Sequence, residues 1–162
     1  MESNYLLPYI ISNIIGLLFL WASIKNPQLA RLMFVLLFGW ASWINYTLSH
    51  QEPEKYLEYA RAAIHLYSGF INGWFRQHIT EMVTLIAIGQ GFIALGMLLK
   101  GWWVKVACIG VIIFLISISP LGLYAAFPFS ITVSLAAWFI IKKDSLNYLW
   151  KFQAKHKKIV YE

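Results

Sequence analysis

The chain has 162 residues and a formal net charge of +6; 60% of its residues are hydrophobic and only 12% are charged. So few charges cannot cover a water-exposed surface of ordinary polarity, which argues against a soluble globular protein. The basic excess does not indicate nucleic acid either, because much of it follows the last apolar block. We therefore expect no nucleic-acid partner and contact with anionic lipid headgroups instead. The lysines after that block are Lys142, Lys143, Lys151, Lys155, Lys157 and Lys158.

Five apolar blocks are each long enough to cross a bilayer. Each has about 18 to 21 residues, and about 20 residues of helix span a hydrocarbon core of roughly 30 Å. In lipid, each block must close its own backbone hydrogen bonds, so each is predicted as a helix. The sequence predicts an all-α integral membrane protein, a bundle of about five transmembrane helices in one domain (1–141), followed by a basic cytoplasmic tail (142–162). The predicted spans are 5–24, 32–49, 79–99, 102–119 and 121–141.

The basic residues predict the orientation. Ten of the 13 Lys and Arg residues fall on one side of the five spans, and Lys55, Arg61 and Arg76 fall on the other. Basic residues concentrate on the cytoplasmic side, so we expect the N-terminus outside and the C-terminus inside. Met1 is followed by no basic segment and the first block by no small-residue cleavage site, so that block is expected to remain as an anchor.

Two prolines mark expected breaks near the last span. Ser119-Pro120-Leu121-Gly122 is expected to end the fourth helix, because proline lacks a donor and clashes with the preceding turn. Pro128 would then lie about two turns inside the fifth helix and kink it. The single cysteine, Cys108, is expected to be a small apolar packing residue of the fourth span.

The segment 50–78 is the one sizeable connection before the tail. Pro53-Glu54 is typical of a helix start, and apolar residues then recur every three to four positions, which predicts an amphipathic helix of about 18 residues. It is expected either to lie along the outer membrane surface or to cap the bundle. Asn72-Gly73 predicts a turn, after which Trp74 anchors at the interface. In the tail, Asp144-Ser145 is a candidate cap for a second surface helix.

The most suggestive polar group lies at the outer face. His78 and Glu81 are three residues apart and share one helix face, and His50 ends the second span at a similar depth. Together they can serve a proton relay, a metal or a quinone headgroup, or be interfacial residues reached by water. HxxE spacing alone does not specify a metal. Glu81, the one acid within a predicted span, is expected to face the bundle or pair with Arg76 or His78.

Gln90 lies near the middle of the third predicted span and needs a partner, either another helix or a bound ligand. Asn13 and Asn45 are the other amides placed to bond across helices. A membrane haem would require two histidines projecting into the bundle from two helices, and no histidine lies well inside a span, so haem is not expected. The chain has no nucleotide loop, nucleophile elbow or triad pattern, so no catalytic residue is assigned.

Three motifs are shared with a known family: a span that opens at Arg31 and contains Phe34 and Gly39-Trp40, the loop Tyr56-Leu57-Glu58-Tyr59, and the helix IAIGQGFIALGMLL. On these motifs, the chain from Arg31 to Ile141 resembles the DoxX-like family of small bacterial membrane proteins. The chain differs in adding a span before Arg31, and Gln90 stands near the place of a family acid. The resemblance implies a bacterial inner-membrane protein, an accessory subunit near quinone-linked redox systems.

Three functions follow from these observations. The first is a non-catalytic subunit that packs against other membrane proteins or further copies of itself. The second is a quinone- or lipid-binding component of a membrane redox system. Its candidate ligand-binding residues are His50, Trp74, His78, Glu81 and Gln90. The third is a small transporter, for which the chain offers few polar residues inside the spans.

Overall fold

The computed structural model describes residues 3–125 and 127–150. Every regular element in these ranges is helical, as the apolar blocks predict. Elements labelled η are 3-10 helices, except η2, which is a π-helix. In chain order the elements are α1 (Ser3–Lys25), α2 (Pro27–Gln51), η1 (Pro53–Arg61), α3 (His65–Phe70), η2 (Ile71–Phe75), α4 (Ile79–Leu98), α5 (Trp102–Ile118), η3 (Ser119–Ala125) and α6 (Phe129–Lys143).

Among the described residues, four helices are long and apolar enough to cross a membrane. They coincide with the first four predicted spans. Many of their large apolar side chains point outward, and water would penalise that surface whereas lipid would not. The chain is therefore a helical protein of several membrane spans. The four segments are Leu6–Lys25, Pro27–Gln51, Ile79–Leu98 and Trp102–Leu123.

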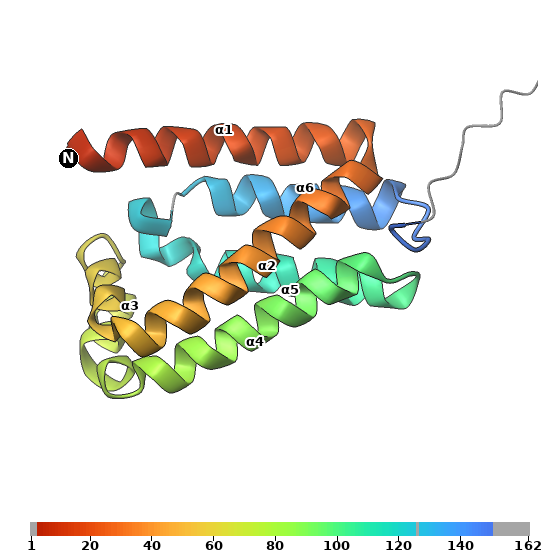
Figure 1. Ribbon diagram of the computed structural model, residues 1–162. Helices are drawn as coiled ribbons and strands as arrows, with labels where there is room; N and C mark the ends of the chain where they lie inside the picture. Colours follow the sequence, from red (N-terminus) through yellow and green to blue (C-terminus); the bar gives the residue numbers. More distant parts are fainter. Residues whose placement is uncertain (1–2, 126, 151–162) are drawn as a thin grey trace, which may run out of the picture.

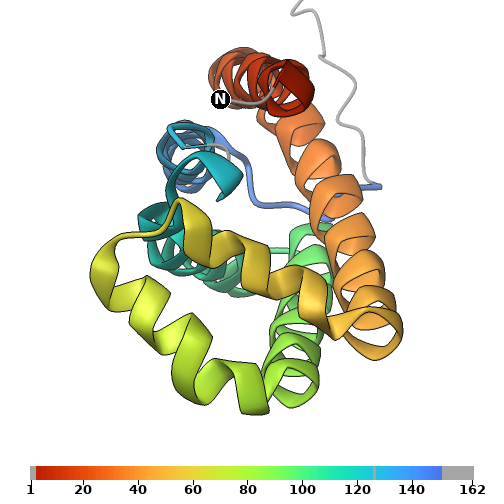
Figure 2. The ribbon, with the colours of Figure 1, turned by 90° about the vertical axis from the view of Figure 1, so that its left-hand side faces the viewer.

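The long helices run back and forth between two ends of the molecule (Figure 1). At one end, here called the basic end, α1 passes to α2, α4 passes to α5, and α6 finishes. At the opposite end, the loop end, lie the connection 52–78 and the connection 119–128. Neighbouring helices pack in the cyclic order α1, α2, α4, α5, α6 and back to α1. Figure 2 shows this arrangement from the loop end.

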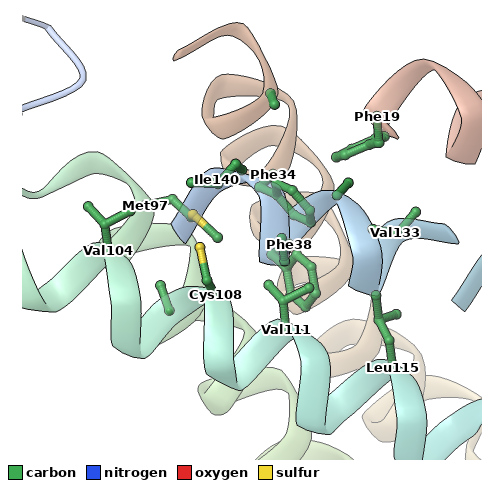
Figure 3. Packing of buried hydrophobic residues seen from close by; sticks show 14 of the residues in the cluster. Phe19, Phe34, Phe38, Met97, Val104, Cys108, Val111, Leu115, Val133 and Ile140 are labelled. Atoms are coloured by element: carbon green, nitrogen blue, oxygen red, sulfur yellow. The ribbon is translucent and has the colours of Figure 1, made fainter. Parts of the chain in front are cut away.

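The interior is filled by apolar side chains contributed by all of these helices (Figure 3). The Phe19 and Phe34 rings meet edge to face at 4.8 Å, which joins α1 to α2. Cys108 is fully buried in the same cluster, as expected for a packing residue. Because lipid is as apolar as this core, van der Waals contact and interhelical hydrogen bonds must supply the helix association.

The start of the fifth predicted helix is wrong by eight residues. The chain after α5 forms the short helix η3, in which Gly122 has φ of 69°, and α6 begins only at Phe129. Pro128 precedes α6 and does not kink it from inside. The reason is local: the pair Pro120 and Gly122 favours a turn, and Pro128 has no N–H to continue a helix across it.

The prediction of a single helix in the outer segment is also wrong. The predicted 18-residue helix is divided into η1 and α3, because Ile64 adopts an extended backbone with ψ of 155°. The Ile64 N–H then donates to the Pro120 carbonyl at 3.0 Å, which ties the segment to η3. The predicted turn at Asn72-Gly73 is present as a kink at Gly73. Figure 2 shows the segment lying across the loop end.

Candidate functional site

The most tightly bound polar group is a buried ion pair at the basic end. Arg31 Nη1 lies 3.1 Å from Asp144 Oδ1, and both side chains are fully buried. The remaining guanidinium contacts go to backbone oxygens. Nε and Nη2 donate to the Met97 carbonyl, Nη2 also to that of Leu99, and Nη1 also to that of Asn147, at 2.7–3.0 Å. All five donors of the guanidinium are thus used, and we call this group the ion-pair clamp.

The clamp fixes the residues that follow α6. Asp144 Oδ1 also accepts the N–H of Leu146, which has a positive φ of 54°. The Leu146 carbonyl accepts from Gly101 N–H at 2.7 Å, and Leu149 N–H donates to the Leu98 carbonyl at 3.1 Å. Residues 144–149, here called the C-terminal strap, therefore lie against the α4–α5 connection. The prediction that Asp144-Ser145 caps a surface helix is wrong, because residues 144–150 are not helical.

From the sequence, Arg31 is expected only as one of the basic residues that orient the spans. Its partner lies 113 residues away, and no local spacing links the two. The signal that could have found them is the cost of a charge near the membrane: an arginine and an aspartate flanking spans at the same end are better paired than alone. Chemically, a guanidinium with every donor used is a structural element rather than a ligand site.

A second polar group joins α2 to α4 inside the span. Asn45 Nδ2 donates to Gln90 Oε1 at 2.8 Å, and Tyr56 Oη donates to Asn45 Oδ1 at 2.8 Å. Gln90 therefore has the interhelical partner that its depth required, and Asn45 is that partner. Ser42 Oγ adds a bond to the Ala87 carbonyl at 2.7 Å. These bonds stabilise the α2–α4 pair, each by about 0.6 kcal/mol on average.

The predicted residues at the outer face are distributed over separate positions. Among residues 3–125 and 127–150, no three His, Cys, Asp or Glu side chains are grouped so that they could hold a metal. His50 contacts its own helix, with Nδ1 2.7 Å from the Tyr46 carbonyl. Glu81 is exposed and is absent from the ion pairs of the described residues. The expectation that Glu81 faces the bundle or pairs with Arg76 or His78 is wrong.

Trp74 and His78 are the pair of predicted site residues that the structure brings together. Their rings stack with centroids 4.3 Å apart and planes inclined by 16°, and His78 Nδ1 lies 2.9 Å from the Trp74 carbonyl. Trp74 is half exposed at 51%, and its ring also stacks with the Phe70 ring, at a centroid distance of 5.9 Å. Together they form an aromatic surface at the loop end.

The buried phenol of Tyr56 should make the stability of the fold depend on pH. Burial, and secondarily Tyr59, raises the pKa of Tyr56 from 10.0 to about 12. As the pH rises, Tyr56 therefore ionises more readily in the unfolded chain than in the folded one. The free energy of unfolding keeps its full contribution from the neutral Tyr56 below pH 10 and loses it as the pH rises towards 12. Ultraviolet titration should show a tyrosine that ionises late, and Tyr56→Phe should remove it. A Tyr56→Phe curve equal to that of the wild type would contradict this assignment.

Among the described residues, basic side chains concentrate at the basic end and most of the acidic ones at the loop end. The exposed lysines of the basic end are accompanied there by one acid, Asp144, which Arg31 neutralises. At the loop end, Glu52, Glu54, Glu58 and Glu81 outnumber Lys55, Arg61 and Arg76. Lys100 lies over the Tyr148 ring at 5.2 Å and Lys142 over the Trp138 ring at 4.9 Å. Such amphipathic pairs are typical of the headgroup region of a membrane.

No protein-family model, curated protein or solved structure matches the chain. The helices, their lipid-compatible outer surface and the paired polar groups inside define the chain as a multi-pass helical membrane protein.

Proposed function

We propose that the protein is a non-catalytic helical subunit that acts by packing against other membrane proteins. One observation supports this most directly. Among the described residues, Thr84 Oγ1 and Asp144 Oδ2 are the only buried side-chain polar atoms without a hydrogen-bond partner. The other buried polar groups bond to helices of the same chain, as Asn45 and Arg31 do. The interior polarity thus serves the bundle itself, and the outward surface is left for interactions.

The proposed setting is the bacterial cytoplasmic membrane, with the N-terminus outside and the basic end inside. We include α6 as a fifth span, since it packs against α1 and α5 and ends at the basic end like the other inward-running helices. The charge separation between the two ends supports this orientation. Membership of the DoxX-like family belongs to the same proposal and rests on the motifs around Gly39, Tyr56 and Gln90.

Photo-crosslinking in intact cells tests the subunit proposal. A photoreactive amino acid is placed at Ile113 on α5 or Leu135 on α6, which are 62% and 48% exposed. We expect a defined protein adduct from at least one of these positions. Val111, fully buried on α5, is the matched control and should give none. Adducts to lipid alone at both exposed positions would contradict the proposal.

A quinone or lipid headgroup site is the second candidate, and the Trp74–His78 stack favours it. A half-exposed aromatic cluster near the interface, made of Phe70, Trp74 and His78, can pack against a quinone ring. If this function holds, organic extracts of the purified protein contain quinone, and Trp74→Ala with His78→Ala reduces its amount severalfold. Glu81→Gln tests the carboxylate in the same assay. An unchanged quinone content in all of these variants would exclude this candidate.

A further inference from the structure

The outward side shared by α2 and α4 has properties that plain contact with lipid does not explain. We call it the α2–α4 face. Its large apolar members are 63–69% exposed, and a histidine and a glutamate lie at its loop end. The residues that define this face are Leu36, Trp43, His50, Glu81, Leu85 and Phe92.

His50 and Glu81 lie at the same depth and point to the same side. Thr80 Oγ1 donates to the Ser49 carbonyl at 3.0 Å, so these two residues are level with each other on α2 and α4. The next residue on each helix is rotated by about 100°. Because the two helices run antiparallel, the rotations carry His50 and Glu81 to the same outward side. A histidine and a carboxylate thus flank the α2–α4 contact.

Tryptophan also lies deeper on this face than membrane-interface anchors do. Seven residues separate Trp43 from His50, which is about 10 Å along a helix. Tryptophans in contact with lipid concentrate at the headgroup level. One turn from Trp43, Gly39 has no atom within 4 Å of the position a Cβ would take. A bulky side chain therefore stands beside an open space, as required for interlocking with a neighbouring helix.

We infer that a second copy of this chain docks on the α2–α4 face, related by a two-fold axis parallel to the helices. Such an axis preserves depth and places His50 of one copy opposite Glu81 of the other, twice. The imidazole would then pair with a carboxylate that has no ion pair among residues 3–125 and 127–150. The inference rests on the proposed subunit function and names one partner for it.

A charge exchange tests the pairing directly. Energy transfer between labelled full-length copies is measured in liposomes. We expect His50→Glu and Glu81→His each to weaken dimerisation about tenfold. The double variant should recover most of the wild-type affinity, because the two charges are exchanged and the pair is retained. Loss in the singles without recovery in the double, or no loss in the singles, would overturn the pairing.

Two open glycines provide a steric test with a matched control. Gly39 lies on the α2–α4 face, whereas Gly69 lies on α3 in the connection at the loop end. Neither has an atom within 4 Å of a built Cβ. Gly39→Leu should reduce dimerisation at least about tenfold and Gly69→Leu should leave it unchanged. Equal effects, or a monomeric wild type, would overturn the inference, while a partner crosslinked at Ile113 or Leu135 would still support the subunit function.

Discussion

Asp144→Ala should lower the free energy of unfolding by about 3–5 kcal/mol, because it leaves Arg31 as a buried charge without its counter-ion. The substitution also removes the acceptor of the Leu146 N–H and should release the C-terminal strap. Equilibrium unfolding in mixed detergent micelles measures the effect. Lys25→Ala removes an exposed charge at the same end and should change stability by less than about 0.5 kcal/mol.

The double variant Arg31→Met with Asp144→Leu separates the loss of the pair from the burial of a lone charge. Replacing a buried ion pair by apolar residues is often near neutral, whereas removing one partner is costly. We therefore expect the double variant to unfold with a higher free energy than Asp144→Ala. The carbonyls of Met97 and Leu99 lose their donor in it, so full recovery is not expected. A wild-type stability for Asp144→Ala would contradict the clamp.

Gly122→Ala has the second largest expected effect. A Cβ at this position would stand 2.6 Å from the Ala62 carbonyl oxygen, and the residue has a positive φ of 69°. Strain of about 1–3 kcal/mol is expected from the backbone conformation, and the clash adds a similar amount. We expect η1 to separate from η3 and the loop end to open. Proteolysis of the connection 52–78 should accelerate accordingly.

Gly101→Ala is the matched control for Gly122→Ala. Gly101 has a similar backbone, with φ of 57°, and no atom within 4 Å of a built Cβ. It should therefore cost the strain alone, about 1–3 kcal/mol, with no effect on proteolysis of the loop end. Equal loss of stability in the two variants, without opening of the loop end, would show that η1 is not held at Gly122.

The helical membrane fold follows from the sequence because its cause is local. An apolar block of about 20 residues must form a helix in lipid, whatever its neighbours are. The outer segment does not form the single helix that its apolar spacing predicts. Its helix is interrupted at Ile64, whose N–H donates a hydrogen bond to the Pro120 carbonyl in a different part of the chain. The start of α6 was misplaced for a related reason: composition continues smoothly through Leu121 to Phe127, and only the backbone at Gly122 and Pro128 ends the helix.

The polar groups, too, could be predicted from the sequence only in part. That Gln90 needed an interhelical partner was predictable from its depth, and Asn45 supplies it. For the ion-pair clamp, the cost of a lone charge near the membrane favours pairing at the basic end, but it does not say which residues pair, since Arg31 and Asp144 are 113 residues apart. Glu81 was expected inside because charge in lipid is expensive, yet it is exposed. A second copy on the α2–α4 face would supply the missing partner.

The proposed subunit function is tested most directly by the mass of the full-length protein after mild extraction from its native membrane. Native mass spectrometry should detect at least two copies of the 18.7 kDa chain, together with a second membrane protein in fixed ratio. That result would support a subunit that works through its outward faces. A homogeneous monomer, free of other proteins in every mild detergent, would contradict it.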